Sequence, residues 1–338
     1  MSTKKGIFGV CAAQGALLHP FLKSNKFEIL GNLEPRGVFH TKNEEQWRLN
    51  FGDIPFSKDK SLFKGLKPFA IVGSPSCGHS SMFSYSRKKT LGEPKSDPTL
   101  NLFVSSLIEF QPEVFLMENL PKLLDLIPLL EWEKLLPNYK LLVHAHSVME
   151  FGNSQKSRKR LMLIGVRVDS RVKLKYFKDI FRVATPLKTR ELKKYIRKDL
   201  NFREDGDKKL AMYHPNDPKK TTLTVDQVKK IWSTEFKNEY KWPVRKAKMK
   251  TLPGVYRNRK DAYPLTLRPA NRQFNPRCQV MGLEEFRVIM GFPPEFKVYY
   301  NETNKTYWLN KGRNTLSKGA CYEVGLWFSR CLDKVKVI

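Results

Sequence analysis

Short apolar runs alternate with longer polar stretches through the first 150 residues, and this alternation constrains the fold more than any other feature. Apolar runs lie at 7–10, 27–32, 70–73 and 113–117, and glycine or proline punctuates the loops between them. Runs of this length read as buried strands, and the intervening stretches suit helices. Such a succession is typical of doubly wound α/β folds with a parallel sheet. We therefore expect an α/β protein.

A cysteine and a glutamate follow two of these runs. Cys77 lies in a loop of small, turn-forming residues after the run at 70–73, and Glu118 directly follows the run at 113–117. Because the carboxyl ends of parallel strands meet at one edge of a sheet, we expect the two side chains to share a pocket. Loops at strand ends present reactive groups, so Cys77 is a candidate nucleophile. The alternatives are a buried structural thiol and a glutamate that only stabilises a helix start.

The first two runs carry the features of a nucleoside-binding half. A turn of small residues at 9–15 follows the first run, and Glu34 lies just beyond the second. Backbone amides at such a turn can approach a ligand closely, and a carboxylate at the tip of the next strand can accept hydrogen bonds from ribose hydroxyls. Many α/β chains show this pattern by chance, so it is a weak signal alone.

Cysteine usage and hydropathy indicate the compartment. The five cysteines are dispersed without paired spacing, which argues against a disulfide framework and for a reducing environment. No apolar run reaches the roughly 18 residues of a membrane span. The basic and apolar start imitates a signal peptide, but Gln14, His19 and Lys23 interrupt it, and we interpret it as the first strand. The histidines show no ligand spacing beyond a weak zinc candidate at His144 and His146, and we predict no metal.

The net charge of +29 comes from 62 basic and 33 acidic residues among 338. Residues 171–260 hold 27 basic and 10 acidic residues, a net charge of +17 within about a quarter of the chain. Aromatic residues interleave with this charge, at Tyr176, Phe177, Tyr195, Trp232, Tyr240, Trp242 and Tyr256. Such a surface suits a polyanion, with nucleic acid as the first candidate. The alternative is a basic surface that serves only solubility.

The α/β alternation ends where the basic stretch begins. Prolines punctuate residues 166–270, and an amphipathic helix at about 318–332 closes the chain. We predict a domain boundary near residue 168. Residues 1–168 would form a catalytic and cofactor-binding domain to which residues 311–338 return, and residues 169–310 would form a smaller, basic domain.

Six short motifs, in order, resemble those of the C5-cytosine DNA methyltransferase family. Residues 73–81, G-S-P-S-C-G-H-S-S, resemble its catalytic G-G-P-P-C-Q-x-x-S loop, with Cys77 in register. Residues 117–120 resemble its E-N-V motif, and Arg158 and Arg160 resemble the end of its Q-x-R-x-R motif.

The other three motifs extend the resemblance along nearly the whole chain. Residues 52–54, G-D-I, are similar to the adenine-pocket motif. Residues 283–293 resemble R-E-x-x-R-x-x-G-F-P, and Asn314 falls where the final G-N-x-V-P motif belongs. Each motif alone is unspecific, and the six together in order and spacing indicate the family. The resemblance implies a Rossmann-like S-adenosylmethionine-dependent methyltransferase sheet with a smaller, basic target-recognition domain.

The resemblance implies a mechanism. Cytosine C5 is not nucleophilic enough to accept a methyl group from a sulfonium unaided, and addition of the Cys77 thiolate at C6 makes it so. Glu118 would stabilise the charge that builds toward N3, and Arg160, with Arg158, would hold the base oxygen and the adjacent phosphate. The base must leave the duplex to be reached. The 84–97 loop would close over it, while residues 169–270 would read the flanking duplex DNA.

The implied cofactor is S-adenosylmethionine. The residues that the resemblance assigns to it are Phe8, Val10, Ala12, Glu34, Asp53, Pro75 and Asn314. This side of the site departs from the family pattern, because Val10 and Ala12 stand at glycine positions and Asn32 stands where the ribose-binding carboxylate is commonest. The loop before Arg158 either carries one extra residue or has Lys156 in place of the family's glutamine.

We expect an active DNA (cytosine-5-)-methyltransferase that acts as a cytoplasmic monomer in a bacterial cell, encoded by the bacterium or by a virus. Two alternatives stay open. One is the same chemistry on RNA or with an altered donor. The other is a catalytically silent DNA-binding relative.

Overall fold

A computed structural model describes residues 4–35, 40–76, 97–155, 158–187, 287–298 and 320–335. It also describes the backbone of four short strands, β8 (Leu210–Tyr213), β9 (Thr222–Leu223), β10 (Tyr256–Arg257) and β11 (Gln273–Phe274). β8 pairs with β9 and β10 pairs with β11.

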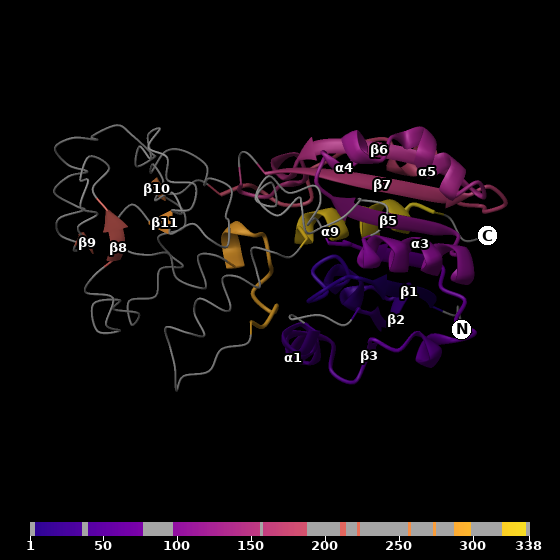
Figure 1. The fold of residues 1–338 in the computed structure, drawn as a ribbon, viewed down its shortest axis with the longest axis horizontal. Coiled ribbons are helices and arrows are strands. Elements are labelled where there is room, and N and C mark those ends of the chain that lie inside the picture. Colours follow the sequence, from indigo (N-terminus) through magenta and orange to yellow (C-terminus); the bar gives the residue numbers. More distant parts are fainter. Residues whose placement is uncertain are drawn as a thin grey trace.

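One seven-stranded sheet organises the described chain, in the order β3-β2-β1-β4-β5-β7-β6 (Figure 1). The first five of these strands run parallel, whereas β7 pairs antiparallel with both β5 and β6. The strands are β1 (Lys5–Val10), β2 (Phe27–Leu33), β3 (Phe56–Ser57), β4 (Ala70–Gly73), β5 (Val114–Asn119), β6 (Tyr139–Ser147) and β7 (Lys159–Arg167). The predicted α/β class with a parallel sheet is confirmed, with an antiparallel edge.

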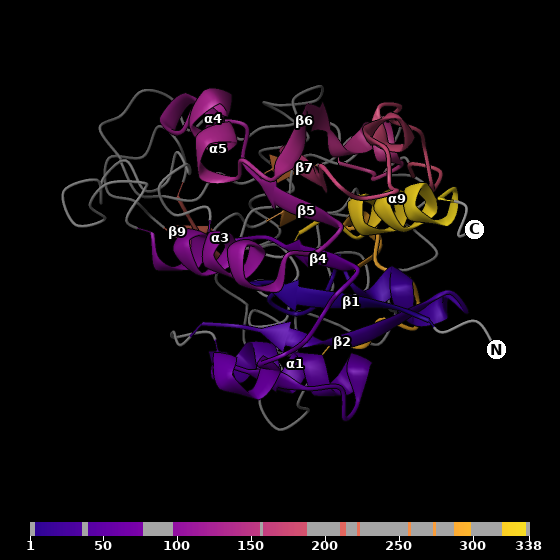
Figure 2. The same ribbon diagram turned by 90° about the vertical axis from the view of Figure 1, so that its right-hand side faces the viewer.

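Helices cover both faces of the sheet. The α-helices are α1 (His40–Phe51), α3 (Pro98–Phe110), α4 (Leu123–Leu126), α5 (Leu129–Leu135) and α9 (Tyr322–Asp333). The 3₁₀ helices are η1 (His19–Lys23), η2 (Lys60–Phe63), η5 (Val148–Phe151) and η6 (Leu174–Phe177). Figure 2 shows α3 on one side of the sheet and α9 on the other. No helix in the described ranges is long and apolar enough to cross a membrane.

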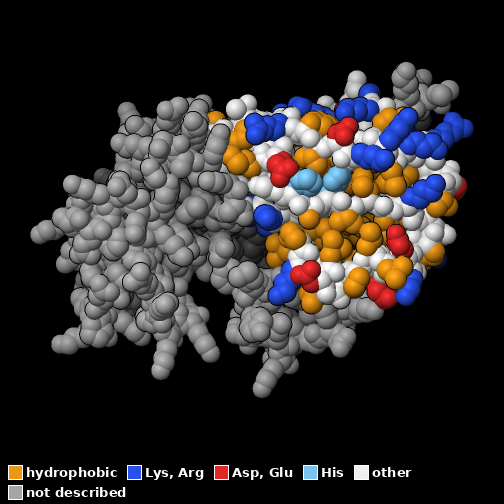
Figure 3. Space-filling view, turned by 90° about the horizontal axis from the view of Figure 1, so that it is seen from above, with side chains coloured by type: hydrophobic (Ala, Val, Ile, Leu, Met, Phe, Trp, Pro, Cys, Tyr) orange, Lys and Arg blue, Asp and Glu red, His pale blue; other side chains and the backbone are white. Residues whose placement is uncertain are grey.

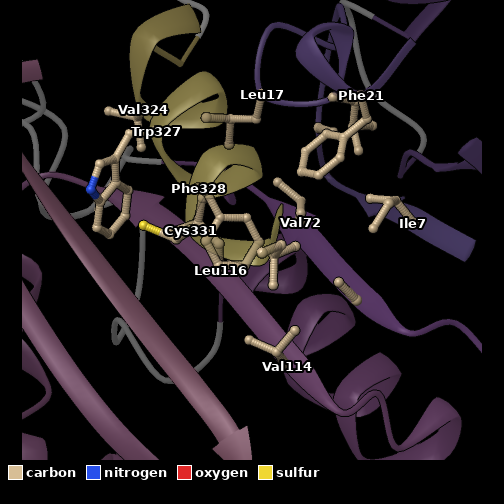
Figure 4. Close-up of a cluster of buried hydrophobic side chains, with 14 of the residues drawn as sticks. Ile7, Leu17, Phe21, Val72, Val114, Leu116, Val324, Trp327, Phe328 and Cys331 are labelled. Carbon is tan, nitrogen blue, oxygen red and sulfur yellow. The ribbon is translucent and has the colours of Figure 1, made fainter. Parts of the chain in front are cut away.

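Each face of the sheet has its own apolar core, and alternate residues of β1 enter different ones. Ile7 joins the core under α9, whereas Phe8 joins the core under α3. Trp327 and Phe328 of α9 lie over the sheet in the first core, in which all the labelled side chains of Figure 4 are buried. The central strands β4, β5 and β7 are therefore buried on both faces, as continuous apolar strands predict.

The strands were easier to predict than the helices. The strands expected at 7–10, 27–32, 70–73 and 113–117 form, and α3 lies in the stretch between the last two of these runs. The stretch between β1 and β2 forms only the short η1, where Pro20 at the start removes a backbone donor. α1 was not predicted, since its apolar residues do not form a clear stripe.

Residues beyond the predicted boundary near 168 also pack on this body. Val172, Phe177 and Val183 belong to the core under α9. Phe292 and Phe296 pack with Ala16 and Tyr322 in a third, smaller cluster. The division into two domains stays a prediction, with the described part of 169–187 and 287–298 seated on the first.

Candidate active site

The chain leaves the sheet after β4 at a close contact with β1. A Cβ at Gly73 would lie 1.9 Å from the carbonyl oxygen of Val10, so glycine alone permits this approach. Ser74 N then donates to Cys11 O at 3.2 Å. Ser76 N donates to Thr99 Oγ1 at 2.8 Å, at the start of α3. The segment that leads to Cys77 is thus fixed to its neighbours, while Cys77 itself lies outside the described residues.

Glu118 and Asn119, at the end of β5, bond to this same segment. Ser74 Oγ donates to Glu118 Oε2 at 2.7 Å, and Asn119 Nδ2 donates to Pro75 O at 3.1 Å. The sequence predicts that the loop after β4 and Glu118 share one edge of the sheet. The hydrogen bonds place Glu118 beside Ser74, which lies three residues before Cys77 in the chain.

Glu118 also pairs with Arg160. Arg160 Nε lies 2.7 Å from Glu118 Oε1, and the Glu118 side chain is 3 % exposed. The antiparallel register places Glu118 opposite Met162, so Arg160 is the diagonal neighbour on the same face. The contact lacks hydrogen-bond alignment, and among the described residues Oε1 accepts no hydrogen bond. A buried acceptor with a cation beside it can receive a donor from a substrate.

Arg158 has a different environment from Arg160, and its contact with the substrate stays a prediction. Its side chain is 2 % exposed. Its Nε donates to Cys321 Sγ at 3.2 Å, and its Nη1 donates to Met290 Sδ at 4.0 Å. Burial lowers the pKa of Arg158, and Arg160 lowers it further, while Cys321 and Glu118 raise it. Arg158 lies just before β7, which begins at Lys159, so its side chain is not held by the strand alternation that would place it on the same face as Arg160.

The predicted cofactor carboxylate, Glu34, is buried beside the turn after β1. Its Oε2 accepts from Ala13 N at 2.9 Å and from Asn32 Nδ2 at 3.3 Å. Its Oε1 accepts from Asn43 Nδ2 at 3.1 Å. Burial raises the pKa of Glu34 to about 7, against the lowering effect of the hydrogen bonds from Ala13, Asn32 and Asn43. Ala12 N donates to Asn32 Oδ1 at 3.3 Å, so Asn32 fixes the turn and Glu34 supplies the carboxylate.

Phe8 and Val10 are core residues, and their assignment to the cofactor stays a prediction. Both are fully buried in the core under α3. The Phe8 ring lies 4.8 Å from that of Phe63 and 5.4 Å from that of Phe110, centroid to centroid. Because alternate residues of β1 enter different cores, the side chains of this strand are packed in a core before the chain reaches the turn after β1.

The other predicted cofactor residues are distributed around the site. Asp53 is exposed on the turn after α1, and Pro75 lies in the segment after β4. Asn314 lies outside the described residues. The expected zinc candidates have other partners, because His144 Nε2 lies 2.8 Å from Phe177 O and His146 Nδ1 lies 2.7 Å from Glu150 Oε2. Across the described ranges no three His, Cys, Asp or Glu side chains gather in a possible metal site.

A family comparison decides what this arrangement belongs to. The model of the C-5 cytosine-specific DNA methylase family matches residues 20–309, which is most of the chain. The chain belongs to this family. The match begins after the turn that follows β1, which is where the family's pattern is weakest in the sequence. No curated protein sequence matches the chain.

Solved structures share the fold of this C-5 cytosine methylase at low identity. A DNA modification methyltransferase encoded within an E. coli prophage is 16 % identical, with a TM-score of 0.62, over 98 % of this chain and 99 % of that one. The S. pombe Dnmt2 methyltransferase is 14 % identical, with a TM-score of 0.64, over 99 % and 100 %. The Entamoeba histolytica methyltransferase EhMeth is 12 % identical, with a TM-score of 0.64, over the same shares.

Several polar residues of this methylase escaped the sequence analysis. Ser74 bonds Glu118, and Gln14, in the turn after β1, is 2 % exposed with no partner for its Nε2 among the described residues. Gln155 is fully buried and donates to Asn153 and to Met290, which supports the alternative of one extra residue before Arg158. Local sequence gives no signal for Ser74 or Gln14, since serine and glutamine are ordinary loop residues. Gln155 could have been found from its motif.

Proposed function

We propose that this methylase transfers a methyl group from S-adenosylmethionine to C5 of cytosine in duplex DNA, through a covalent bond between Cys77 and C6. The observation that carries the proposal is the buried Glu118, which contacts Arg160 on one oxygen and Ser74 on the other. Ser74 lies three residues before Cys77. A carboxyl group and a guanidinium beside a cysteine loop are the groups that a cytosine ring needs on its N3 and O2 side.

The three cysteines that the structure describes are poor candidates for the nucleophile, and this favours Cys77. Cys11, Cys321 and Cys331 are buried. Burial raises the pKa of each of these three thiols. Because only the thiolate is nucleophilic, such thiols are poor nucleophiles. Cys77 is the cysteine whose loop leads directly from the Glu118 site, and we assign the nucleophile to it.

The residues act in a defined order in the proposed reaction. The Cys77 thiolate adds to C6, and the electron density that moves into the ring is stabilised by a proton or hydrogen bond from Glu118 at N3. Arg160 holds the base oxygen, since it already lies at the Glu118 carboxyl group. The ring is then nucleophilic at C5. After methylation a water molecule takes the C5 proton, the C5–C6 double bond forms again as the C6–S bond breaks, and a proton given to N3 returns to Glu118, which restores the Cys77 thiolate.

The turn after β1 fits the cofactor that the family implies. Gln14 offers a buried amide donor without a partner among the described residues, and Glu34 offers a buried carboxyl group at the tip of β2. We propose that Glu34 accepts hydrogen bonds from ribose hydroxyls, that Gln14 and the backbone of Ala12 line the turn, and that Asp53 contacts the adenine. Pro75 and Asn314 complete the proposed set. S-adenosylmethionine, when bound, supplies an electrophilic methyl group on a sulfonium.

Charge supports a nucleic-acid substrate. The chain carries a net charge of +29, and on the face seen in Figure 3 the Lys and Arg side chains of the described residues lie mainly along the upper border. We propose that residues 169–270 read duplex DNA and that the 84–97 loop closes over a cytosine flipped out of the duplex. Basic charge alone fits RNA equally, so RNA is the second candidate substrate. A catalytically silent DNA-binding relative is the third reading.

The setting is a separate part of the proposal. We propose a monomeric enzyme in the cytoplasm of a bacterial cell, encoded by the bacterium or by a virus. The structural similarity to a methyltransferase encoded within an E. coli prophage supports this setting.

The experiment that tests the proposal traps the Cys77 adduct. A duplex oligonucleotide containing 5-fluorocytosine is incubated with the protein and S-adenosylmethionine, and the mixture is separated on a denaturing gel. Fluorine at C5 blocks release of the cysteine, so the proposal predicts a covalent complex with the wild-type protein and none with Cys77→Ser. Trapping of a 5-fluorocytosine RNA and not of the duplex would move the function to RNA. Absence of any adduct on either nucleic acid would contradict the mechanism.

A further inference from the structure

A buried carboxyl group that the proposed chemistry does not use lies behind the Glu118 and Arg160 pair. Glu323 is in the first turn of α9 and is 1 % exposed. The turn at Gly291 presses against it, because a Cβ at Gly291 would lie 1.5 Å from Glu323 Oε1. Gly291 has φ +78°, a conformation that side chains other than glycine rarely adopt. Glycine at residue 291 therefore leaves the space that the Glu323 carboxyl group occupies.

Glu323 is bound by one residue of the chain between β6 and β7. Asn153 Nδ2 donates to Glu323 Oε1 at 3.1 Å and to Oε2 at 3.0 Å. Asn153 is fully buried. Burial raises the pKa of Glu323 to about 7, while the hydrogen bonds from Asn153 and the charge of Arg158 lower it. The hydrogen bonds join α9 to a segment 170 residues away in the sequence.

Asn153 passes this constraint to the residues that follow it. Its Oδ1 accepts from Gln155 N at 2.9 Å and from Gln155 Nε2 at 3.1 Å. Gln155 Nε2 also donates to Met290 Sδ at 3.2 Å, the sulfur that Arg158 Nη1 reaches. The two carboxyl oxygens of Glu323 therefore hold Asn153 and, through it, Gln155. The Gln155 amide contacts the same Met290 sulfur as Arg158.

Arg158 in turn sets the start of β7. Val148 N donates to Arg158 O at 2.8 Å, and Arg158 Nε donates to Cys321 Sγ, two residues before Glu323. A buried guanidinium needs a nearby negative charge. Glu118 and Glu323 both act on Arg158 by charge. Only Glu323 is free of a role in the proposed chemistry.

We propose that Glu323 is a positioning residue: through Asn153 it holds Arg158 inside the protein and so fixes β7 in the register where Arg160 meets Glu118. This inference rests on the proposed function. It predicts that the charge and the two hydrogen bonds of Glu323 matter to catalysis although the residue touches no substrate.

The first test compares Glu323→Gln with Glu113→Gln in the full-length protein. Glutamine keeps the size of the side chain but removes the charge and one of the two acceptors for Asn153. At pH 8 we expect kcat for methyl transfer from labelled S-adenosylmethionine to a cytosine-containing duplex to fall about tenfold, with KM for the donor changed less than about twofold. Glu113 is the matched control, because its carboxyl group also accepts a side-chain hydrogen bond, from Ser170 Oγ at 2.7 Å, at the opposite end of β5. Its variant is expected to keep the wild-type kcat.

The second test exchanges the amide and the carboxyl group between residues 153 and 323. In the double variant Asn153→Asp and Glu323→Gln, the new amide donates to the new carboxylate, and the latter still accepts from Gln155. We expect this exchange to recover kcat to within about threefold of the wild type. A merely structural contribution of residue 323 to stability does not predict such recovery. A Glu323→Gln protein with wild-type kcat, or a double variant no better than the single one, would overturn the proposal.

A readout without activity separates this inference from the proposed function. Amide hydrogen exchange at Gln155 and at the start of β7 is expected to quicken at least about tenfold in Glu323→Gln and to stay unchanged in Glu113→Gln. If the wild-type protein transfers no methyl group, the proposed function fails, while faster exchange at these amides would still support Glu323 as the residue that holds Arg158. Unchanged exchange would overturn that role whatever the activity.

Discussion

At the scale of single residues, the two arginines of the R-x-R motif have different environments. Arg160 meets a carboxyl oxygen that accepts no hydrogen bond among the described residues, whereas Arg158 is buried and donates to the sulfur atoms of Cys321 and Met290. Sulfur is a weak acceptor, and the charges of Glu118 and Glu323 also stabilise the Arg158 guanidinium. One arginine is therefore free to exchange Glu118 for a substrate oxygen, and the other keeps the backbone in place.

Substitution of Glu118 tests the first of these roles. Glu118→Gln keeps the shape of the side chain and can still accept from Ser74, but it removes the charge that Arg160 faces. We expect kcat to fall about 100-fold or more, in the range of a lost proton donor. Steady-state methyl transfer to a cytosine duplex measures it, with Ser74→Ala as the milder variant. A Glu118→Gln enzyme within twofold of wild type would exclude the proposed role at N3.

Glu34 makes a prediction about pH. Its pKa in the folded protein is about 7, above the ordinary value of 4.5, so the folded state binds the proton more tightly than the unfolded state. The stability that this provides is complete below pH 4.5 and is lost as the pH rises through about 7. The stability of wild type relative to Glu34→Gln should therefore fall by a few kcal/mol between pH 5 and pH 8. Urea unfolding at the two pH values measures this, and a constant difference would contradict it.

At the scale of elements, the active site depends on strands whose directions differ. The parallel order of β1, β4 and β5 brings their carboxyl ends to one edge, and the antiparallel β7 presents its amino end there. The start of α9 packs against the turn at Gly291, and the Glu323 carboxyl group lies between that turn and Asn153. The site is thus assembled from the ends of strands and the start of a helix, which pack closely against one another.

A glycine substitution tests this packing. Gly291→Ala places a methyl group on the Glu323 carboxyl group, so we expect a loss of several kcal/mol in the free energy of unfolding. Gly65→Ala is the matched control, because Gly65 has a similar φ of +82° with nothing within 4 Å of the added Cβ. Only the backbone strain of about 1–2 kcal/mol should appear there. Equal losses in urea unfolding of the two variants would show that the space beside Glu323 is not needed.

At the scale of the whole molecule, the sequence predicted what is local and missed what is distant. The apolar runs identified the central strands, and the order of the strand ends predicted that Glu118 and the loop after β4 lie together. The interior position of Arg158 could not be predicted, because its partners Met290 and Cys321 lie 132 and 163 residues away in the chain. The place of Phe8 in the core under α3 could not be predicted from the motif, because a motif does not show which face of β1 each side chain occupies.

The net charge of the chain predicts how its binding to nucleic acid depends on salt. With +29 charges, binding to a nucleic acid should be dominated by release of counterions from phosphates. We expect the dissociation constant for a duplex oligonucleotide to rise about 100-fold or more between 50 and 200 mM salt. Fluorescence anisotropy across that range measures the slope. An affinity that does not depend on salt would contradict a role for the basic surface in substrate binding.

The most direct test of the central claim is methyl transfer itself. Wild-type protein and Cys77→Ser are incubated with S-adenosylmethionine carrying a labelled methyl group and with a cytosine-containing duplex DNA or RNA, and the nucleosides are separated after digestion. The account predicts label in 5-methylcytosine from the duplex DNA with the wild-type protein and none with Cys77→Ser. Label from the RNA alone would keep the chemistry and change the substrate. No label in either nucleic acid, or equal label with Cys77→Ser, would contradict the account.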